Sequence, residues 1–149
     1  MITKHANEAW TVGMAFAGVW HNQHNSEMEL KIGPGGQVNG TFRTATCDHH
    51  DKVEEFPLTG FVSQDVIAFC VNFTEHGCVT AWVGQMDEGN NESIQTLWHM
   101  ALDVGTNKNQ LWKSTVAGAD SFIRGNRQSN KSELPTQASH PVFLNKNED

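Results

Sequence analysis

The sequence predicts an all-β protein that forms an eight-stranded antiparallel up-and-down β-barrel. Short stretches of alternating apolar and polar residues recur along the chain, which is the pattern of strands buried on one face. Clusters rich in Gly and Asn separate the stretches at 33–36, 75–77, 88–91 and 105–109, where we expect turns. No window has a sustained helical period. Closing the hairpins into a barrel removes exposed strand edges.

The strands follow in order between these turns. We expect them at about 15–21, 26–32, 37–46, 53–62, 65–74, 78–87, 92–102 and 110–123. About eight strands leave an interior just wide enough for one small ligand. The 149 residues fit one domain, which we divide into an N-terminal extension (1–13), the barrel (14–124) and a flexible, mostly polar tail (125–149). The apolar patch at 140–144 could alternatively dock on the barrel.

Composition excludes several classes of partner. The 17 acidic and 10 basic residues give a net charge of -7, which argues against binding to nucleic acid or to an anionic membrane. No apolar run could span a bilayer, and residues 1–10 lack a signal-peptide profile. The cluster Cys47-Asp48-His49-His50-Asp51 has no second ligand pair at zinc spacing, so we interpret it as a solvated loop and expect no metal.

The sixth expected strand indicates which side chains face the interior. With Trp82 inward, period-two alternation also directs Cys78 and Thr80 inward. The turn at 74–77 then places three residues of the preceding strand on the same face, in the pairs Phe73–Cys78, Val71–Thr80 and Phe69–Trp82.

Other strands add to this interior by the same parity: Trp98 points with Met100, and Phe42 points with Thr44 and Thr46. Aromatic walls with isolated hydroxyls suit a neutral ligand with a polar head. A filled barrel core is the alternative, and the residues alone leave it open.

The run 111–122 carries an aromatic ring and a carboxylate on one strand. Trp112 and Asp120 are eight residues apart, so they share a face if no bulge intervenes. A ring and an acceptor on one face make a small-molecule pocket plausible.

Several blocks between about 18 and 122 resemble the avidins and streptavidin, a family of eight-stranded biotin-binding barrels. The blocks are, in order, Gly18-Val19-Trp20-His21-Asn22-Gln23 with Ser26, Gly40-Thr41-Phe42, Pro57-Leu58-Thr59-Gly60, Trp82-Val83-Gly84-Gln85, Gln95-Thr96-Leu97-Trp98, and Trp112-Lys113-Ser114-Thr115 with Gly118 and Asp120. The resemblance implies a streptavidin-like barrel that binds biotin with high affinity and has no catalytic activity.

The resemblance also implies a role for each matching residue. Asn22 and Ser26 would donate to the ureido oxygen of biotin, and Asp120 and Thr44 would each accept one ureido N–H. Thr80 would contact the thioether sulfur. The other contacts would come from the walls Trp82, Trp98 and Phe73, from Phe42, Cys78 and Met100 beside them, from Thr46 in the loop over the valeryl chain, and from Trp112, which would cap the site of a neighbouring subunit.

Several positions depart from the family pattern. Phe42 stands where the family usually has a tyrosine whose hydroxyl is a third donor to the ureido oxygen. Losing one buried hydrogen bond costs about 1–3 kcal/mol. Phe73 replaces a common tryptophan, and His24 and Cys78 stand where leucine and serine are familiar. We therefore expect an affinity below the family's best, although His24 or a water could supply the lost donor.

The three cysteines permit at most one internal bridge. By strand parity Cys78 faces inward and Cys70 outward, which argues against a bond between them. Cys47 begins the loop after the third strand and is the better partner. The possible disulfide is therefore Cys47–Cys78. Some bacterial avidins carry a similar bridge between a loop and a strand, although their cysteines stand at different sequence positions.

Assembly and location follow from the resemblance alone. A tryptophan such as Trp112 that reaches into a neighbour's site implies a homotetramer, which we favour over a homodimer. The family resemblance also implies a secreted or periplasmic protein.

Two other functions compete with biotin binding. A lipocalin-like carrier of another small hydrophobic molecule follows from Phe42, which removes a polar contact. An enzyme that uses Asp120 with a histidine as acid and base lacks a nucleophile–base pairing or a metal motif, so we expect neither catalysis nor a cofactor.

Overall fold

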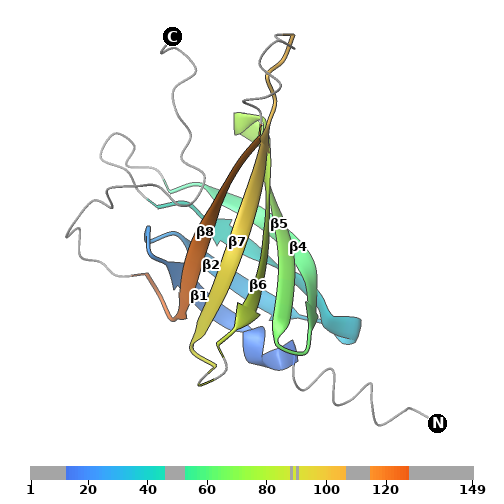
Figure 1. The fold of residues 1–149 in the computed structure, drawn as a ribbon, viewed down its shortest axis with the longest axis vertical. Helices are drawn as coiled ribbons and strands as arrows, with labels where there is room; N and C mark the ends of the chain where they lie inside the picture. Colours follow the sequence, from blue (N-terminus) through green and yellow to red (C-terminus); the bar gives the residue numbers. More distant parts are fainter. Residues whose placement is uncertain (1–12, 46–52, 88, 90, 107–114, 128–149) are drawn as a thin grey trace.

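In the computed structural model, residues 13–45, 53–87, 89, 91–106 and 115–127 are described. In this part of the chain, eight strands pair antiparallel with their sequence neighbours, and β8 pairs with β1 to close a barrel (Figure 1). The predicted fold class is therefore confirmed. The strands are β1 (Gly18–Asn22), β2 (Glu27–Ile32), β3 (Gln37–Arg43), β4 (Glu55–Ser63), β5 (Val66–Phe73), β6 (Cys78–Met86), β7 (Ser93–Leu102) and β8 (Thr115–Arg124).

Three short 3-10 turns lie before or between strands: η1 (Met14–Phe16), η2 (Pro34–Gly36) and η3 (Thr74–His76). Gly35 and Gly36 in the second have φ angles of 74° and 77°, and Gly77 after the third has 63°. These left-handed conformations favour glycine because they would crowd a Cβ atom. The Gly clusters that predicted the turns thus have a conformational cause.

One end of the barrel is plugged. Phe16 of η1 and Trp20 of β1 are fully buried, and Trp20 Nε1 donates to the Phe16 carbonyl at 2.9 Å. The Arg124 guanidinium lies 4.2 Å from the centre of the Trp20 ring and donates to the carbonyls of Ala15 (2.6 Å) and Ala17 (3.0 Å). Buried side chains therefore close this end of the barrel.

Neighbouring strands approach closely at several glycines, among them Gly40 and Gly60. A Cβ atom on Gly40 would lie 1.8 Å from the Glu29 carbonyl oxygen, and one on Gly60 would lie 2.0 Å from that of Ala68. Both glycines belong to the blocks that carried the family resemblance, so part of that resemblance reflects strand packing rather than ligand binding.

Inward side chains alternate with exposed ones along the strands, as in β5, where every second residue is buried. The described part of the chain contains no helix long and apolar enough to cross a membrane.

Candidate functional site

The predicted site residues gather at the end of the barrel opposite η1, where odd-numbered strands end and even-numbered strands begin. Thr46 and Trp112 lie outside the described residues. Ten of the other eleven are buried and Thr44 is half-buried; the buried ones are Asn22, Ser26, Phe42, Phe73, Cys78, Thr80, Trp82, Trp98, Met100 and Asp120. Six different strands, β1, β3 and β5 to β8, thus supply side chains to one interior.

The strand register confirms the predicted inward face. The pairs of β5 and β6 are Phe69–Trp82, Val71–Thr80 and Phe73–Cys78. Across β6 and β7, Trp82 pairs with Trp98 and Thr80 with Met100. Cys78 is buried and Cys70 is exposed, as their parity predicted.

Aromatic rings surround the Trp82 indole. Phe69 stacks on it with ring centres 5.0 Å apart, and the Phe42 ring lies on it at 5.2 Å with a tilt of 32°. Phe73 meets Phe42 edge-on at 5.9 Å. Phe42 is 1% exposed, so the position that lacks the family's tyrosine hydroxyl is apolar and fully packed.

The Asp120 carboxylate is 2% exposed and accepts hydrogen bonds from three side chains. Trp82 Nε1 donates to Oδ2 at 2.9 Å, and Asn22 Nδ2 lies 3.4 Å from the same oxygen. Gln23 Nε2 donates to Oδ1 at 3.2 Å. The carboxylate is therefore held in one orientation.

Gln23 is a positioning residue that the sequence reasoning missed. Its Nε2 also donates to the Ala119 carbonyl at 3.1 Å, and its Oε1 accepts from the Ser121 amide at 3.0 Å. In the sequence, Gln23 stands out only because it follows Asn22 in one of the blocks that resemble the avidins. No local pattern indicates that its side chain bonds to β8.

The turn from Asn22 to Ser26 orients the Asn22 side chain. Asn22 Oδ1 accepts from the backbone amides of His24 (3.1 Å) and Ser26 (2.9 Å). Because the oxygen is committed to these amides, the Nδ2 group must point toward Asp120. One of the two Nδ2 hydrogens remains available to another acceptor.

The hydroxyls of Ser26 and Thr44 are each held by a backbone group. Ser26 Oγ accepts from the Ala45 amide at 3.2 Å, which leaves its own proton to donate. Thr44 Oγ1 accepts from the Glu54 amide at 3.2 Å and lies 3.4 Å from the Glu54 carbonyl oxygen, so one lone pair remains. One hydroxyl can thus donate and the other can accept.

Two buried polar atoms have no hydrogen-bond partner within the described residues: Thr80 Oγ1 and Trp98 Nε1. Buried polar groups are nearly always paired, since leaving one unpaired costs about 1–3 kcal/mol. Both belong to the candidate site.

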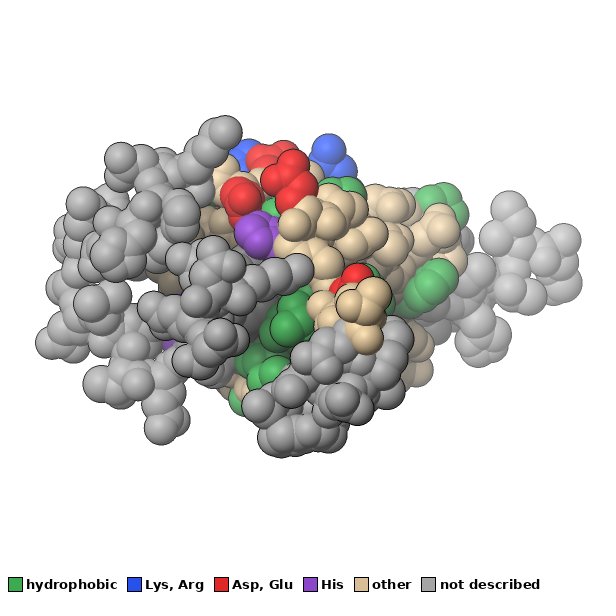
Figure 2. All heavy atoms as spheres, turned by 90° about the horizontal axis from the view of Figure 1, so that it is seen from above, with side chains coloured by type: hydrophobic (Ala, Val, Ile, Leu, Met, Phe, Trp, Pro, Cys, Tyr) green, Lys and Arg blue, Asp and Glu red, His purple; other side chains and the backbone are tan. Residues whose placement is uncertain are grey.

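The rim of the site is polar. Acidic side chains and a histidine gather on the face seen from above in Figure 2. His76 Nε2 lies 2.7 Å from Glu54 Oε2. Glu54, whose amide donates to Thr44, is thereby linked to the β5–β6 turn that contains His76. His24 is 8% exposed, and burial lowers the pKa of its imidazole below the usual value.

The cluster Cys47 to Asp51 lies outside the described residues, so the Cys47–Cys78 bridge stays a prediction. Among the described residues, no group of three or more His, Cys, Asp or Glu side chains could hold a metal ion.

Comparisons with known proteins agree with this architecture. The avidin family profile matches residues 11–125. Avidin of Gallus gallus is 27% identical over an alignment of 119 residues, and the match covers 74% of this chain and 78% of the relative. The solved rhizavidin–biotin complex is 30% identical and has a TM-score of 0.60 over 79% of this chain and 98% of that one. A biotin-binding protein from chicken, 22% identical with a TM-score of 0.63 over 74% of this chain and 95% of that one, shares the fold. The chain therefore belongs to the avidin family.

Proposed function

We propose that this protein binds biotin at the open end of its barrel and catalyses no reaction. The avidin family consists of non-catalytic proteins that take biotin as a ligand, and the 30% identical rhizavidin has been solved in complex with biotin. The observation that carries the proposal within this chain is a pair of buried atoms, Thr80 Oγ1 and Trp98 Nε1, that have no partner among the described residues, in the same interior as the oriented Asp120 carboxylate.

The polar groups suit the ureido head of biotin. Asn22 Nδ2 and the Ser26 hydroxyl are the donors for its oxygen, because their acceptor atoms are already engaged by backbone amides. Asp120 and the remaining lone pair of Thr44 are the acceptors for its two N–H groups.

The apolar groups suit the rest of the ligand. Thr80 would contact the thioether sulfur, and the walls Trp82, Trp98 and Phe73 would enclose the rings, with Phe42, Cys78 and Met100 beside them. Thr46 would cover the valeryl chain and Trp112 would cap a neighbouring site. A Cys47–Cys78 bridge would tie the covering loop to β6, and two or more alkylated thiols in the non-reduced, denatured protein would contradict it.

A biotin titration by calorimetry tests the function. We expect saturable heat at about one biotin per chain and a raised melting temperature, because a ligand that binds only the native state stabilises it. No heat and no thermal shift at saturating biotin would reject the proposal. Native mass spectrometry of protein exposed to lysate then tests the alternative, a carrier of another small hydrophobic molecule, which the apolar Phe42 favours.

We further propose that the chain forms a homotetramer in preference to a homodimer. The outward positions of β5 to β8 form an uncharged face, whose residues are Val66, Ala68, Cys70, Asn72, Val79, Ala81, Val83, Gln85, Gln95, Leu97, His99, Ala101, Thr115, Ala117, Ala119 and Ser121. By contrast, β2 directs Glu27, Glu29 and Lys31 outward. Val83 and Leu97, 62% and 70% exposed, pair in register at the middle of the uncharged face.

An uncharged face with exposed apolar side chains such as Val83 and Leu97 is typical of an interface, and a second copy matches it by twofold symmetry. Trp112 would supply the contact between the resulting pairs. Light scattering should give the mass of a tetramer for the parent chain. Leu97→Lys places a charge on the uncharged face and should lower that mass. An unchanged mass would show that the subunits associate through another surface.

A further inference from the structure

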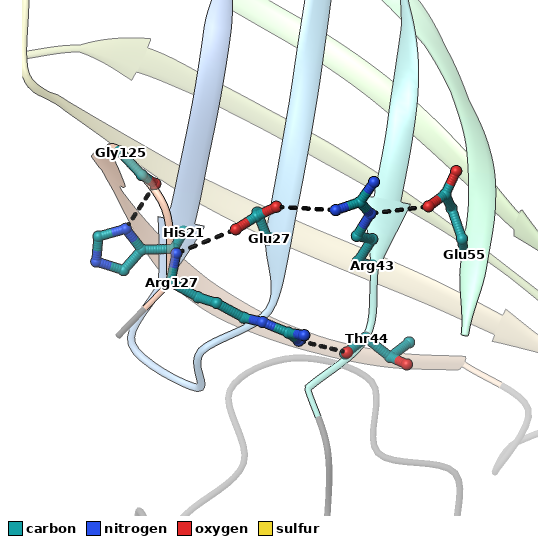
Figure 3. Close-up of polar contacts among 7 residues, drawn as sticks. All are labelled: His21, Glu27, Arg43, Thr44, Glu55, Gly125 and Arg127. Atoms are coloured by element: carbon teal, nitrogen blue, oxygen red, sulfur yellow. Dashed lines mark hydrogen bonds and ion pairs between the residues drawn. The ribbon is translucent and has the colours of Figure 1, made fainter. Parts of the chain in front are cut away.

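The chain that leaves β8 runs beside β1, bonds to the Glu27 side chain of β2 and reaches the site through the Arg127 side chain. Gly125, with a φ of 115°, turns the backbone, and its amide donates to the Val19 carbonyl at 2.8 Å. His21 Nδ1 lies 2.9 Å from the Gly125 carbonyl oxygen, and the Arg127 amide donates to Glu27 Oε2 at 3.1 Å. Figure 3 shows this strap, residues 125–127, running beside β1, with the Arg127 side chain extending past β2 toward Thr44.

The strap ends on a peptide group that borders the site. Arg127 Nη1 donates to the Thr44 carbonyl oxygen at 3.4 Å (Figure 3). The N–H of the same peptide group belongs to Ala45 and donates to Ser26 Oγ at 3.2 Å. The Thr44–Ala45 peptide group is therefore held from both sides.

Glu27 anchors the strap because both of its carboxylate oxygens are engaged. Oε2 accepts from the Arg127 amide, and Oε1 lies 3.4 Å from Arg43 Nη1. Arg43 Nε in turn donates to Glu55 Oε2 at 2.8 Å. The Glu27 side chain is 13% exposed, so solvent competes little for these contacts.

We propose that Arg127 is a positioning residue for the ligand site. Its guanidinium fixes the plane of the Thr44–Ala45 peptide group, and the N–H of that group occupies an acceptor site of Ser26 Oγ so that the Ser26 proton points to the ligand. The inference rests on the proposed function, since Ser26 is the proposed donor to the ureido oxygen. It extends the site to a residue that contacts no ligand.

Dissociation of biotin from the full chain tests this role. Arg127→Ala should raise the dissociation rate by about twofold to tenfold, the range that one ordinary hydrogen bond spans. Arg127→Lys, which keeps a cationic donor, should restore part of the loss. Lys31→Ala is the matched control, because it removes the same charge from the outer face of β2 and should leave the rate unchanged.

A double-mutant cycle separates positioning from general stabilisation. If Arg127 acts through Ser26, then Arg127→Ala should change the rate little in a Ser26→Ala background. An equal effect in both backgrounds, or no effect in the parent, would overturn the inference.

Amide hydrogen exchange of the unliganded protein tests the role of Arg127 independently of biotin binding. The peptide that contains Thr44 and Ala45 should exchange faster in Arg127→Ala than in the parent or in Lys31→Ala. A parent that binds no biotin would refute the proposed function, and the exchange result would still decide whether the strap holds this peptide group. Unchanged exchange would overturn the inference in either case.

Discussion

Replacing Asp120 with asparagine changes the site by one atom and keeps its volume. In the parent, Oδ2 accepts from Trp82 and Asn22 and Oδ1 accepts from Gln23. The asparagine nitrogen must replace one of these oxygens, so it meets either the Trp82 N–H, 2.9 Å away in the parent, or the Gln23 amide nitrogen, 3.2 Å away. A donor then faces a donor in both orientations.

Gln23 cannot relieve the conflict by rotating its amide. Rotation would turn its oxygen toward the Ala119 carbonyl and its nitrogen toward the Ser121 amide, and both existing hydrogen bonds would be lost. A hydrogen bond to a charged group contributes about 1.5–3 kcal/mol. We therefore expect Asp120→Asn to raise the biotin dissociation constant by about tenfold to a hundredfold, and Asp120→Ala by at least about tenfold.

Calorimetry with biotin, together with the melting temperature of each unliganded variant, measures this effect. Thr96→Val is the matched control, because Thr96 Oγ1 donates to the backbone oxygen of Asp120 at 2.9 Å and does not contact the carboxylate. The control should lose about 1 kcal/mol of stability and keep its affinity within about threefold. Equal dissociation constants for Asp120→Asn and the parent would remove Asp120 from the ligand site.

Two further substitutions test the interior and the rim. Phe42→Tyr should tighten biotin binding by about threefold to tenfold, because the new hydroxyl supplies a donor to the ureido oxygen. The same hydroxyl should lower the melting temperature of the unliganded protein if it is buried without a partner. Calorimetry that finds no gain in affinity would show that Phe42 does not face the ureido oxygen. His24 should make stability depend on pH. Its folded pKa lies below the unfolded value of 6.5, so the unfolded chain binds more protons as the pH falls below 6.5 and stability is lost. The melting temperature of His24→Leu should therefore fall less steeply than that of the parent between pH 7 and pH 5, and parallel curves would contradict this assignment.

Much of the fold could be predicted because its signals are local. Period-two alternation limits each strand to two orientations, and a short turn of known length selects one register. The β5–β6 pairing followed from these two facts, and Trp82, Thr80 and Cys78 indeed face inward. Strand ends were less certain. The third strand was expected to reach residue 46, but β3 ends at Arg43. The Thr44 amide still donates to the Glu54 carbonyl at 2.9 Å, whereas the following peptide group, Thr44–Ala45, bonds to side chains of Ser26 and Arg127.

The sequence by itself determined the fold class, the inward side chains and, through ordered blocks of residues, the family. Only the tertiary structure decided which distant groups meet. Gln23 reaches Asp120 across 97 positions, and Arg127 reaches Thr44 across 83. These contacts depend on barrel closure and on the stagger of β8 against β1, which no local pattern encodes because alternation repeats identically in every strand. The same closure leaves Thr80 and Trp98 with unpartnered polar atoms among the described residues. The pattern predicts that those side chains point inward, but only the assembled barrel shows that no described neighbour forms a hydrogen bond with them.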